Sequence, residues 1–349
     1  MNSKALYLLG ATPEEVAALM EKHAQPLFRK QQLDDWVWNK RVATFDDMLN
    51  LPGDLRKTLP ESAYLRSLHM VEHLISHDEL TEKWLLTTAD GYGIETVLIR
   101  EQKGKRNTAC ISCSIGCPLN CRFCASARGK FIRHLKAGEI IEQVLQVEQL
   151  SGSRVTNVVF MGTGEPFLNY DEVLAAARRI NSSPGLGIGA RHITVSTVGV
   201  IPGIERFSTE SEEFRLAISF HAPDQETRKK IIPSAEKWRM DRILFALRRY
   251  WHVTRRKVTL EYLLIDGFNA SRKNAMRLCE LLQDIPCKIN CIPFNPVKGY
   301  TWQPPEMKTC REFISIINNN GIRATLRTEK GCDIGAACGQ LRARHIISG

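Results

Sequence analysis

From residue 107 onward, short apolar, strand-forming runs alternate with segments whose apolar residues repeat at helical spacing. Strands and helices that alternate in this way favour a parallel sheet joined by right-handed crossovers. Six to seven such units favour a full or partial barrel over a dinucleotide-binding sheet. In either fold, functional residues gather where strands end. The predicted strands are 108–113, 157–161, 192–196, 215–219, 258–264, 288–292 and 323–327, and the predicted helices are 138–150, 170–180, 204–208, 241–251, 271–282 and 306–319.

The first 80 residues lack this alternation and are predicted to form helices and turns. Thr12 is a suitable N-cap, because Pro13 follows it at the first helical position. Residues 83–100 alternate around a turn at Asp90-Gly91, which predicts a β-hairpin.

The composition of the 349-residue chain excludes several classes of protein. Hydrophobic residues make up 43% and charged residues 25%, which excludes disordered, collagen-like and coiled-coil structures. The longest segment without Asp, Glu, Lys or Arg has 15 residues (107–121), whereas a membrane-spanning helix needs about 18 to 20. The N-terminal segment has no apolar core with a small-residue cleavage site. We therefore expect a cytoplasmic protein without a membrane span.

Positive charge is concentrated after the first 90 residues. The formal net charge is +10, although residues 1–90 carry 10 Lys and Arg against 14 Asp and Glu. Residues 100–136 hold nine basic residues and a single acid, Glu101. Such a stripe is typical of a protein that binds a polyanion, because phosphate contacts release counterions. The alternative is a basic surface that only aids solubility, and charge alone does not decide between them.

Five of the eleven cysteines lie within fifteen residues. An odd number cannot pair completely, and without an export signal reduced thiols for metal binding or catalysis are favoured over disulfides. Cys117, Cys121 and Cys124 form a C-x3-C-x2-C pattern. Three such thiolates can each bind one iron of a [4Fe–4S] cube, which leaves the fourth iron open for a substrate or cofactor. The alternative is structural zinc, with a fourth ligand from Cys110, Cys113 or His134, although zinc sites usually use C-x2-C pairs.

This cysteine pattern after the first strand of a (βα) series resembles the radical S-adenosylmethionine (SAM) superfamily. In that superfamily the open iron binds the amino and carboxylate groups of SAM, and reductive cleavage yields a 5′-deoxyadenosyl radical. The resemblance implies an α/β fold, a (βα)6 partial barrel. It also implies a [4Fe–4S] cluster on Cys117, Cys121 and Cys124, with SAM as the second cofactor.

Further motifs follow the later strands and extend to both ends of the chain. They are Phe28-Arg29-Lys30-Gln31-Gln32, Thr44-Phe45-Asp46-Asp47-Met48, Phe160-Met161-Gly162-Thr163-Gly164-Glu165-Pro166, Ser196-Thr197-Val198-Gly199-Val200-Ile201-Pro202-Gly203-Ile204, Ser219-Phe220-His221-Ala222-Pro223, Ile292-Pro293-Phe294-Asn295-Pro296 and Gly331-Cys332-Asp333-Ile334-Gly335-Ala336-Ala337-Cys338-Gly339-Gln340-Leu341. Together they resemble the RlmN/Cfr family of RNA adenine methyltransferases over essentially the whole chain. The resemblance implies a small N-terminal helical accessory domain that binds RNA (1–80), a β-hairpin linker region (81–106) and a radical SAM barrel with a C-terminal catalytic cysteine (107–349).

The family resemblance also implies catalytic roles. A first SAM methylates Cys338, and the radical from a second SAM takes a hydrogen atom from that S-methyl group. The methylene radical adds to the base, and Cys110 then attacks the sulfur of Cys338, which leaves a Cys110–Cys338 disulfide. We expect Lys105 and Arg106 to favour the Cys110 thiolate. Glu95 matches the family's proposed proton acceptor; the alternative is a solvated carboxylate on a hairpin strand.

Six other residues match the family's SAM contacts. Glycine permits close backbone approach and a carboxylate can pair with an ammonium, which suits Gly164 and Glu165 to the SAM amino group. Alternatives are a plain turn at Gly162-Thr163-Gly164 and a purely structural role for His221. The expected cofactor-binding residues are Gly164, Glu165, Ser196, Ser219, His221 and Asn295.

Several positions depart from the family pattern. Thr163 stands where Met is usual, Phe220 where Leu is usual and Cys113 where Ser is common, and Cys332 and Gly335 replace acids of the tail motif. The extra thiols add competitors for disulfide formation, and the tail changes put the RNA substrate in doubt. Cys279, Cys287, Cys291 and Cys310 are predicted to be buried small hydrophobic residues.

The resemblance implies methylation of C2 of adenosine in 23S rRNA, at the peptidyl transferase centre, and in some members tRNA. Recognition would extrude the target base. The expected partners are the RNA and a one-electron donor such as flavodoxin or ferredoxin, and the protein is expected to be a monomer. Alternatives are Cfr-type C8 methylation with antibiotic resistance, a diverged paralogue with another RNA substrate, a radical SAM enzyme acting on a small molecule or peptide, and a zinc-containing RNA-binding module.

Overall fold

A parallel sheet forms the centre of the computed structural model, which describes residues 5–101, 104, 106–296, 301–327, 330–341 and 344–345. Its strands run in the order β14-β13-β12-β11-β10-β9-β6, and each neighbouring pair is parallel. Every strand predicted after residue 107 is present, within one to three residues at its ends. The bounds are β6 Asn107–Cys110, β9 Asn157–Phe160, β10 Ile193–Thr197, β11 Arg215–Ser219, β12 Val258–Leu264, β13 Cys287–Pro293 and β14 Arg323–Leu326.

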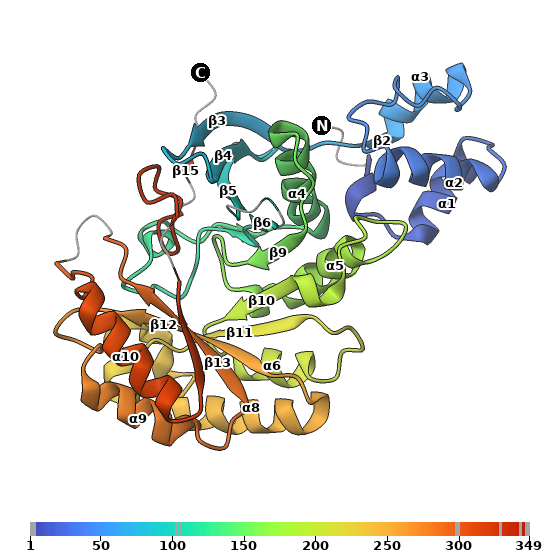
Figure 1. Ribbon diagram of the computed structural model, residues 1–349. Helices are drawn as coiled ribbons and strands as arrows, with labels where there is room; N and C mark the ends of the chain where they lie inside the picture. The colour runs from blue at the N-terminus through green and yellow to red at the C-terminus, as the bar shows by residue number, and fades with distance from the viewer. Residues whose placement is uncertain are drawn as a thin grey trace.

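Helices pack on the outer side of these strands, as Figure 1 shows. The sequence explains where they begin and end. Ser271 caps α9 by accepting a hydrogen bond from the Asn274 amide, and Arg255 ends α8 in a left-handed conformation. The predicted helices are present as α4 Ala137–Ser151, α5 Tyr170–Asn181, α6 Ile201–Phe207, α8 Met240–Thr254, α9 Arg272–Leu282 and α10 Met307–Asn319. The short helix α7, Gln225–Ile231, was not predicted.

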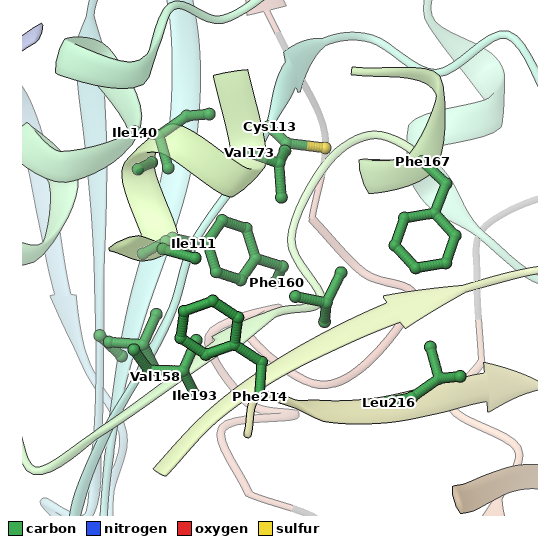
Figure 2. Close-up of a cluster of buried hydrophobic side chains, with 14 of the residues drawn as sticks. Ile111, Cys113, Ile140, Val158, Phe160, Phe167, Val173, Ile193, Phe214 and Leu216 are labelled. Carbon is green, nitrogen blue, oxygen red and sulfur yellow. The ribbon is translucent and has the colours of Figure 1, made fainter. Parts of the chain in front are cut away.

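The core lies between the sheet and these helices. Figure 2 shows Val158, Phe160 and Ile193 of the sheet packed with Ile140 of α4 and Val173 of α5. All five side chains are buried. Burial of a large apolar side chain contributes about 1.5–3 kcal/mol, so this layer fixes the strands whose ends carry the site.

Three antiparallel strands extend the sheet beyond β6 in the order β5-β4-β3. The predicted hairpin is confirmed as β4 (Thr81–Thr87) and β5 (Tyr92–Arg100), with Gly91 at positive φ in the turn. The prediction of helices and turns up to residue 80 was wrong for β3, His69–Ile75. Polar and apolar residues of β3 are almost all exposed, so the strand has no apolar face to reveal it in the sequence.

The N-terminal helices α1 (Pro13–Lys22), α2 (Phe28–Asp34) and α3 (Gly53–Ser62) form a separate small layer beside α4 and α5 (Figure 1). Thr12 caps α1 as predicted, and the pair β1 (Leu6–Tyr7) and β2 (Ala63–Tyr64) closes the layer. Buried Glu142 of α4 accepts hydrogen bonds from the backbone amides of Ser67 (2.8 Å) and Leu68 (3.1 Å). These bonds fix the connection between the helices and the sheet.

The C-terminal segment, residues 330–341, returns to the strands at the start of the barrel (Figure 1). Ala336 and Leu341 pack against Val97 of β5 and Cys110 of β6. A short strand, β15 (Arg344–His345), pairs with β5. The end of the chain thus meets residues more than 200 positions earlier. Across the described residues, every helix is too short or too polar to span a membrane.

Candidate active site

The loop after β6 brings Cys117, Cys121 and Cys124 to the wall of one cavity of about 130 Å³. Left-handed backbone at Gly116 and Asn120 turns the loop around this wall. Burial raises the pKa of the Cys117 thiol to about 12 and the pKa of Cys121 well above its usual value. Neighbouring thiols add to both shifts. These thiols therefore disfavour ionisation unless a positive group binds them.

An iron–sulfur cube fits this donor set. Its irons would supply the positive charge that the three sulfurs lack, and each thiolate binds a different iron. Within the described residues, no group of three His, Cys, Asp or Glu side chains is arranged to hold a single metal ion. A single ion would need ligands that converge on one point. A cube instead needs sulfurs that are spaced around it, and the three cysteines are spaced along one cavity wall.

The six residues expected to bind SAM line the same cavity as the cysteines. They come from the carboxyl ends of neighbouring strands, where a parallel barrel places its functional groups. Gly164 and Glu165 follow β9, Ser196 is the next-to-last residue of β10, Ser219 ends β11, His221 follows it, and Asn295 follows β13.

Position 164 requires glycine, because neighbouring side chains leave no room for a Cβ. Its φ is +119°, and an added Cβ would lie 2.2 Å from Ser114 Oγ and 2.7 Å from Cys113 Sγ. The adjacent Glu165 accepts hydrogen bonds from the amides of Phe167 (3.0 Å) and Val198 (2.9 Å). Glu165 therefore ties the loop after β9 to the loop after β10, and burial raises its pKa to about 7.

His221 combines a structural bond with a position on the cavity wall. Its Nδ1 accepts from the Leu263 amide (3.1 Å), which places the ring proton on Nε2. Phe123, beside the cluster cysteines, packs edge-on against the ring at 4.7 Å. Burial, with the charge of Arg228, lowers the pKa of His221 to about 3, so the ring is neutral.

A second cavity of about 530 Å³ lies inside the barrel and contains both predicted catalytic cysteines. Cys110 and Cys338 line it together, and Cys338 also lines the smaller cavity. Cys110 is buried, which raises its pKa to about 12, and both cysteines are reduced. Cys338 therefore stands between the two cavities.

The tail is held in place by backbone bonds to the segment after the cluster cysteines. The Ala125 amide donates to Gly339 O (2.6 Å) and Ser126 Oγ to Leu341 O (2.6 Å). A Cβ on Gly339 would lie 3.0 Å from Phe123 O, and the φ of this glycine is +83°. Asn295 Nδ2 donates to Cys338 O (3.2 Å). These contacts fix the position of Cys338.

Two charged residues of the cavities were not among the site residues expected from the sequence. Arg327 follows β14 and its Nη1 lies 3.4 Å from Cys338 Sγ. Glu261 of β12 lines both cavities; its Oε1 accepts from Asn290 (3.0 Å), while Oε2 has no hydrogen-bond partner among the described residues. Arg327 stands at the end of a predicted strand, which is the signal that could have found it. Glu261 is a carboxylate in the middle of the otherwise largely apolar strand β12, and that is its signal.

Glu95 is not a solvated carboxylate, so that alternative was wrong. Its side chain is 2% exposed and lies 3.4 Å from Lys83 Nζ, which also donates to Gly335 O of the tail (3.2 Å). Glu95 does not appear among the described residues that line either cavity. Its predicted role as proton acceptor stays a prediction.

The cation beside Cys110 differs from the one expected. Arg327 is the positive group that acts to lower the pKa of Cys110, against the larger effect of burial. Arg106 lines the larger cavity, and Lys105 lies outside the described residues.

The additional cysteines occupy two kinds of position. Cys113 is buried beneath Gly164, and Cys332 Sγ donates to Asn295 Oδ1 (3.3 Å). The four predicted small hydrophobic residues are buried, as expected: Cys279, Cys287, Cys291 and Cys310.

Parts of the basic stripe over residues 100–136 are neutralised within the chain. Arg100 pairs with Glu82, Arg133 with Asp90 and Glu139, and Lys136 with Glu172. The stripe is therefore not one continuous exposed cationic surface.

Comparisons with known proteins cover nearly the whole chain. The family model of the Radical SAM superfamily matches residues 111–279, and that of the Ribosomal RNA large subunit methyltransferase N-terminal domain matches residues 6–65. The probable dual-specificity RNA methyltransferase RlmN of Clostridium novyi (strain NT) is 39% identical over 339 residues, 97% of this chain and 98% of that protein. The protein of the same name from Akkermansia muciniphila is 42% identical over 339 residues, 95% of this chain and 94% of its own length. A crystal structure of a radical SAM methyltransferase from Sphaerobacter thermophilus superposes with a TM-score of 0.93 at 37% identity, covering 97% of this chain and 99% of that one.

Proposed function

Because this chain belongs to the RlmN family of radical SAM RNA methyltransferases, we propose that it methylates C2 of adenosine in 23S rRNA and tRNA. Family membership makes it a SAM-dependent RNA methyltransferase with the radical SAM fold, and excludes the zinc-binding module and the enzyme of small molecules or peptides. The target atom, the RNA substrates and the residue roles are the proposal.

One observation carries the proposal: Cys338 lines both the cavity of the cluster cysteines and the cavity that contains Cys110. A methyl carrier must reach the methyl donor on one side and the acceptor base on the other. Cys338 has that position, and Arg327 and Asn295 hold it there.

The remaining residues divide into two groups by cavity. Cys117, Cys121 and Cys124 would hold a [4Fe–4S] cluster, which would supply reductive cleavage of SAM when bound. Gly164, Glu165, Ser196, Ser219, His221 and Asn295 would form the wall against which SAM binds.

In the larger cavity, Cys110 would resolve the covalent protein–RNA adduct. Its thiolate attacks the sulfur of Cys338, so a Cys110–Cys338 disulfide forms and the Cys338–carbon bond breaks. The electron pair of that bond goes to the carbon, which takes up a proton and stays on the base as the methyl group. Each turnover would consume two SAM molecules, and a flavodoxin or ferredoxin would supply electrons. A cavity of about 530 Å³ suits an adenosine extruded from the RNA.

The decisive experiment is mass mapping of methyladenosine isomers in RNA from cells with and without this gene. We expect 2-methyladenosine in 23S rRNA and in tRNA to disappear with the gene. 8-Methyladenosine in its place would assign the Cfr-type reaction, and unchanged 2-methyladenosine in both RNAs would contradict the proposal.

A further inference from the structure

The inner surface of the barrel is partly polar, whereas most parallel barrels are filled with branched apolar side chains. Inward-facing positions of neighbouring strands carry Thr108 (β6), Thr194 (β10), Thr259 (β12), Asn290 (β13) and Thr325 (β14), and all five line the larger cavity. Hydroxyl and amide groups can donate and accept hydrogen bonds. The larger cavity is therefore suited to a polar ligand along its length.

Four cations gather where these strands begin. Arg215 is the first residue of β11 and Arg323 the first of β14, and Lys288 of β13 is the register partner of Arg323. Arg106 lies just before β6 and, like Arg215 and Lys288, lines the cavity. We call Arg106, Arg215, Lys288 and Arg323 the amino-terminal rim.

The rim is not neutralised within the described part of the chain. None of its four residues forms an ion pair there, in contrast to Arg178, Arg206 and Arg248 on the outer helices, which all bind carboxylates. Burial and the charge of Arg215 lower the pKa of Lys288, and Arg323 and Arg106 act in the same direction. Glu261, deeper in the barrel, acts to raise the pKa of Lys288. Glu101 is the other acid among the described residues that line this cavity. Cations held together against their mutual repulsion suit an anionic ligand.

The cavity connects the rim to the catalytic cysteines. Arg106 and Arg215 are exposed, so the cavity reaches the surface at the amino ends of the strands, while Cys110 and Cys338 line its inner part. Arg323 and Arg327 are four residues apart along β14 and its end, about 13 Å. One extended nucleotide can bridge such a span, with its phosphate at the rim and its base at the cysteines.

We propose that the amino-terminal rim binds backbone phosphates of the RNA beside the target adenosine, which enters the barrel from the amino ends of its strands. This inference rests on the proposed function, because it assumes an RNA substrate. The Thr and Asn side chains between rim and cysteines then face the sugar and base of the inserted nucleotide.

The test is the salt dependence of RNA binding by the reconstituted full-length protein. An RNA hairpin with an unpaired adenosine serves as the probe, and fluorescence anisotropy gives Kd at several salt concentrations. Each phosphate contact contributes about 0.7–0.9 to the slope of log Kd against log salt. The double variant Lys288→Gln/Arg323→Gln should lower that slope by about 1.5 and weaken binding, and Lys288→Arg should keep the wild-type slope.

The matched control is Arg248→Gln, an outer arginine bonded to Asp284 (2.6 Å), which should bind RNA like the wild type. Folding is checked by the mass of the Cys338 peptide after incubation with SAM. A folded rim variant should methylate Cys338, since the rim lies away from the SAM cavity. If the double variant fails this check, Arg215→Gln, at an exposed rim position, replaces it. A rim variant that methylates Cys338 and binds RNA with the wild-type slope would overturn this inference and leave the proposed function standing. A wild-type protein that binds no RNA at any salt concentration would overturn the proposed function itself.

Discussion

The guanidinium of Arg327 lies 3.4 Å from the sulfur of Cys338, and both groups face the interior of the barrel. Arg327 is half-buried, and the proximity of Cys338 raises its pKa above the usual value. A half-buried arginine therefore holds the residue that stands between the two cavities.

Replacement of Arg327 by Met should slow methylation of Cys338 by SAM about 10- to 100-fold, because a hydrogen bond to a charged group is worth about 1.5–3 kcal/mol. Mass spectrometry of the Cys338 peptide over time gives the rate. Arg327→Lys should retain part of it, since the charge is kept and the fork of donors is lost. Methylation at the wild-type rate in Arg327→Met would show that this contact does not position the sulfur.

Variants of the two cysteines that we propose to be catalytic should fail in different ways. Cys338→Ala should abolish RNA methylation while the protein keeps its iron, because Cys338 is not one of the three thiols of the cluster loop. Cys110→Ala should accumulate a covalent protein–RNA adduct, seen as a shifted band on a denaturing gel. Turnover by Cys338→Ala would refute its role as methyl carrier.

Replacement of Gly164 by Ala should weaken SAM binding at least about 10-fold, since the new methyl group would overlap Ser114 Oγ and distort the cavity wall. Equilibrium binding of SAM to the reconstituted protein measures this effect. Gly267→Ala is the matched control: its φ is +62° with no atom within 4 Å of the added Cβ. It should lower the free energy of unfolding by about 1–2 kcal/mol and leave SAM binding unchanged.

Glu261→Gln should raise the free energy of unfolding while lowering the rate of RNA methylation. The buried carboxylate has one oxygen without a donor, and burial raises its pKa, so removal of the charge relieves an unfavourable state. If a hydrogen-bond donor of the substrate binds the free oxygen of Glu261, the substitution removes its negatively charged acceptor, and methylation should slow. Denaturant titration measures the first effect and single-turnover methylation the second; methylation at the wild-type rate would show that the substrate does not use this carboxylate.

Asp90 links the hairpin to the loop before α4 through Arg133 (2.7 Å), and the Arg133 hydrogen bond lowers the pKa of Asp90 from 3.8 to about 2. Its stabilising contribution should therefore be complete above pH 3.8 and lost as the pH falls through 2. Because the pair is partly exposed, Asp90→Asn should lower the free energy of unfolding by only about 0.5–1 kcal/mol near neutral pH. Urea denaturation from pH 7 to pH 2 measures this contribution. The control is Glu213→Gln, which removes the exposed ion pair with Arg191 and should unfold with the wild-type free energy at each pH. A difference for Asp90→Asn that is as large at pH 2 as at pH 7 would exclude this ion pair as its source.

The sequence predicts the barrel well because each buried strand and each amphipathic helix has a pattern set by its own packing. The polar helix α7 and the exposed strand β3 were missed, since neither has an apolar face of sufficient length. The cysteine spacing predicts that Cys117, Cys121 and Cys124 act together, and the three residues line one cavity. The contact of Arg327 with Cys338 could not be predicted, because it depends on a tail that folds back across the barrel.

That returning tail has a consequence for biosynthesis. Residues 330–341 leave the ribosome after every parallel strand, although they bind beside strands made some 230 residues earlier. A nascent chain can therefore form the strands and the cluster loop while Cys338 has not yet been made. The wall that the two cavities share is completed only after all the parallel strands have been synthesised.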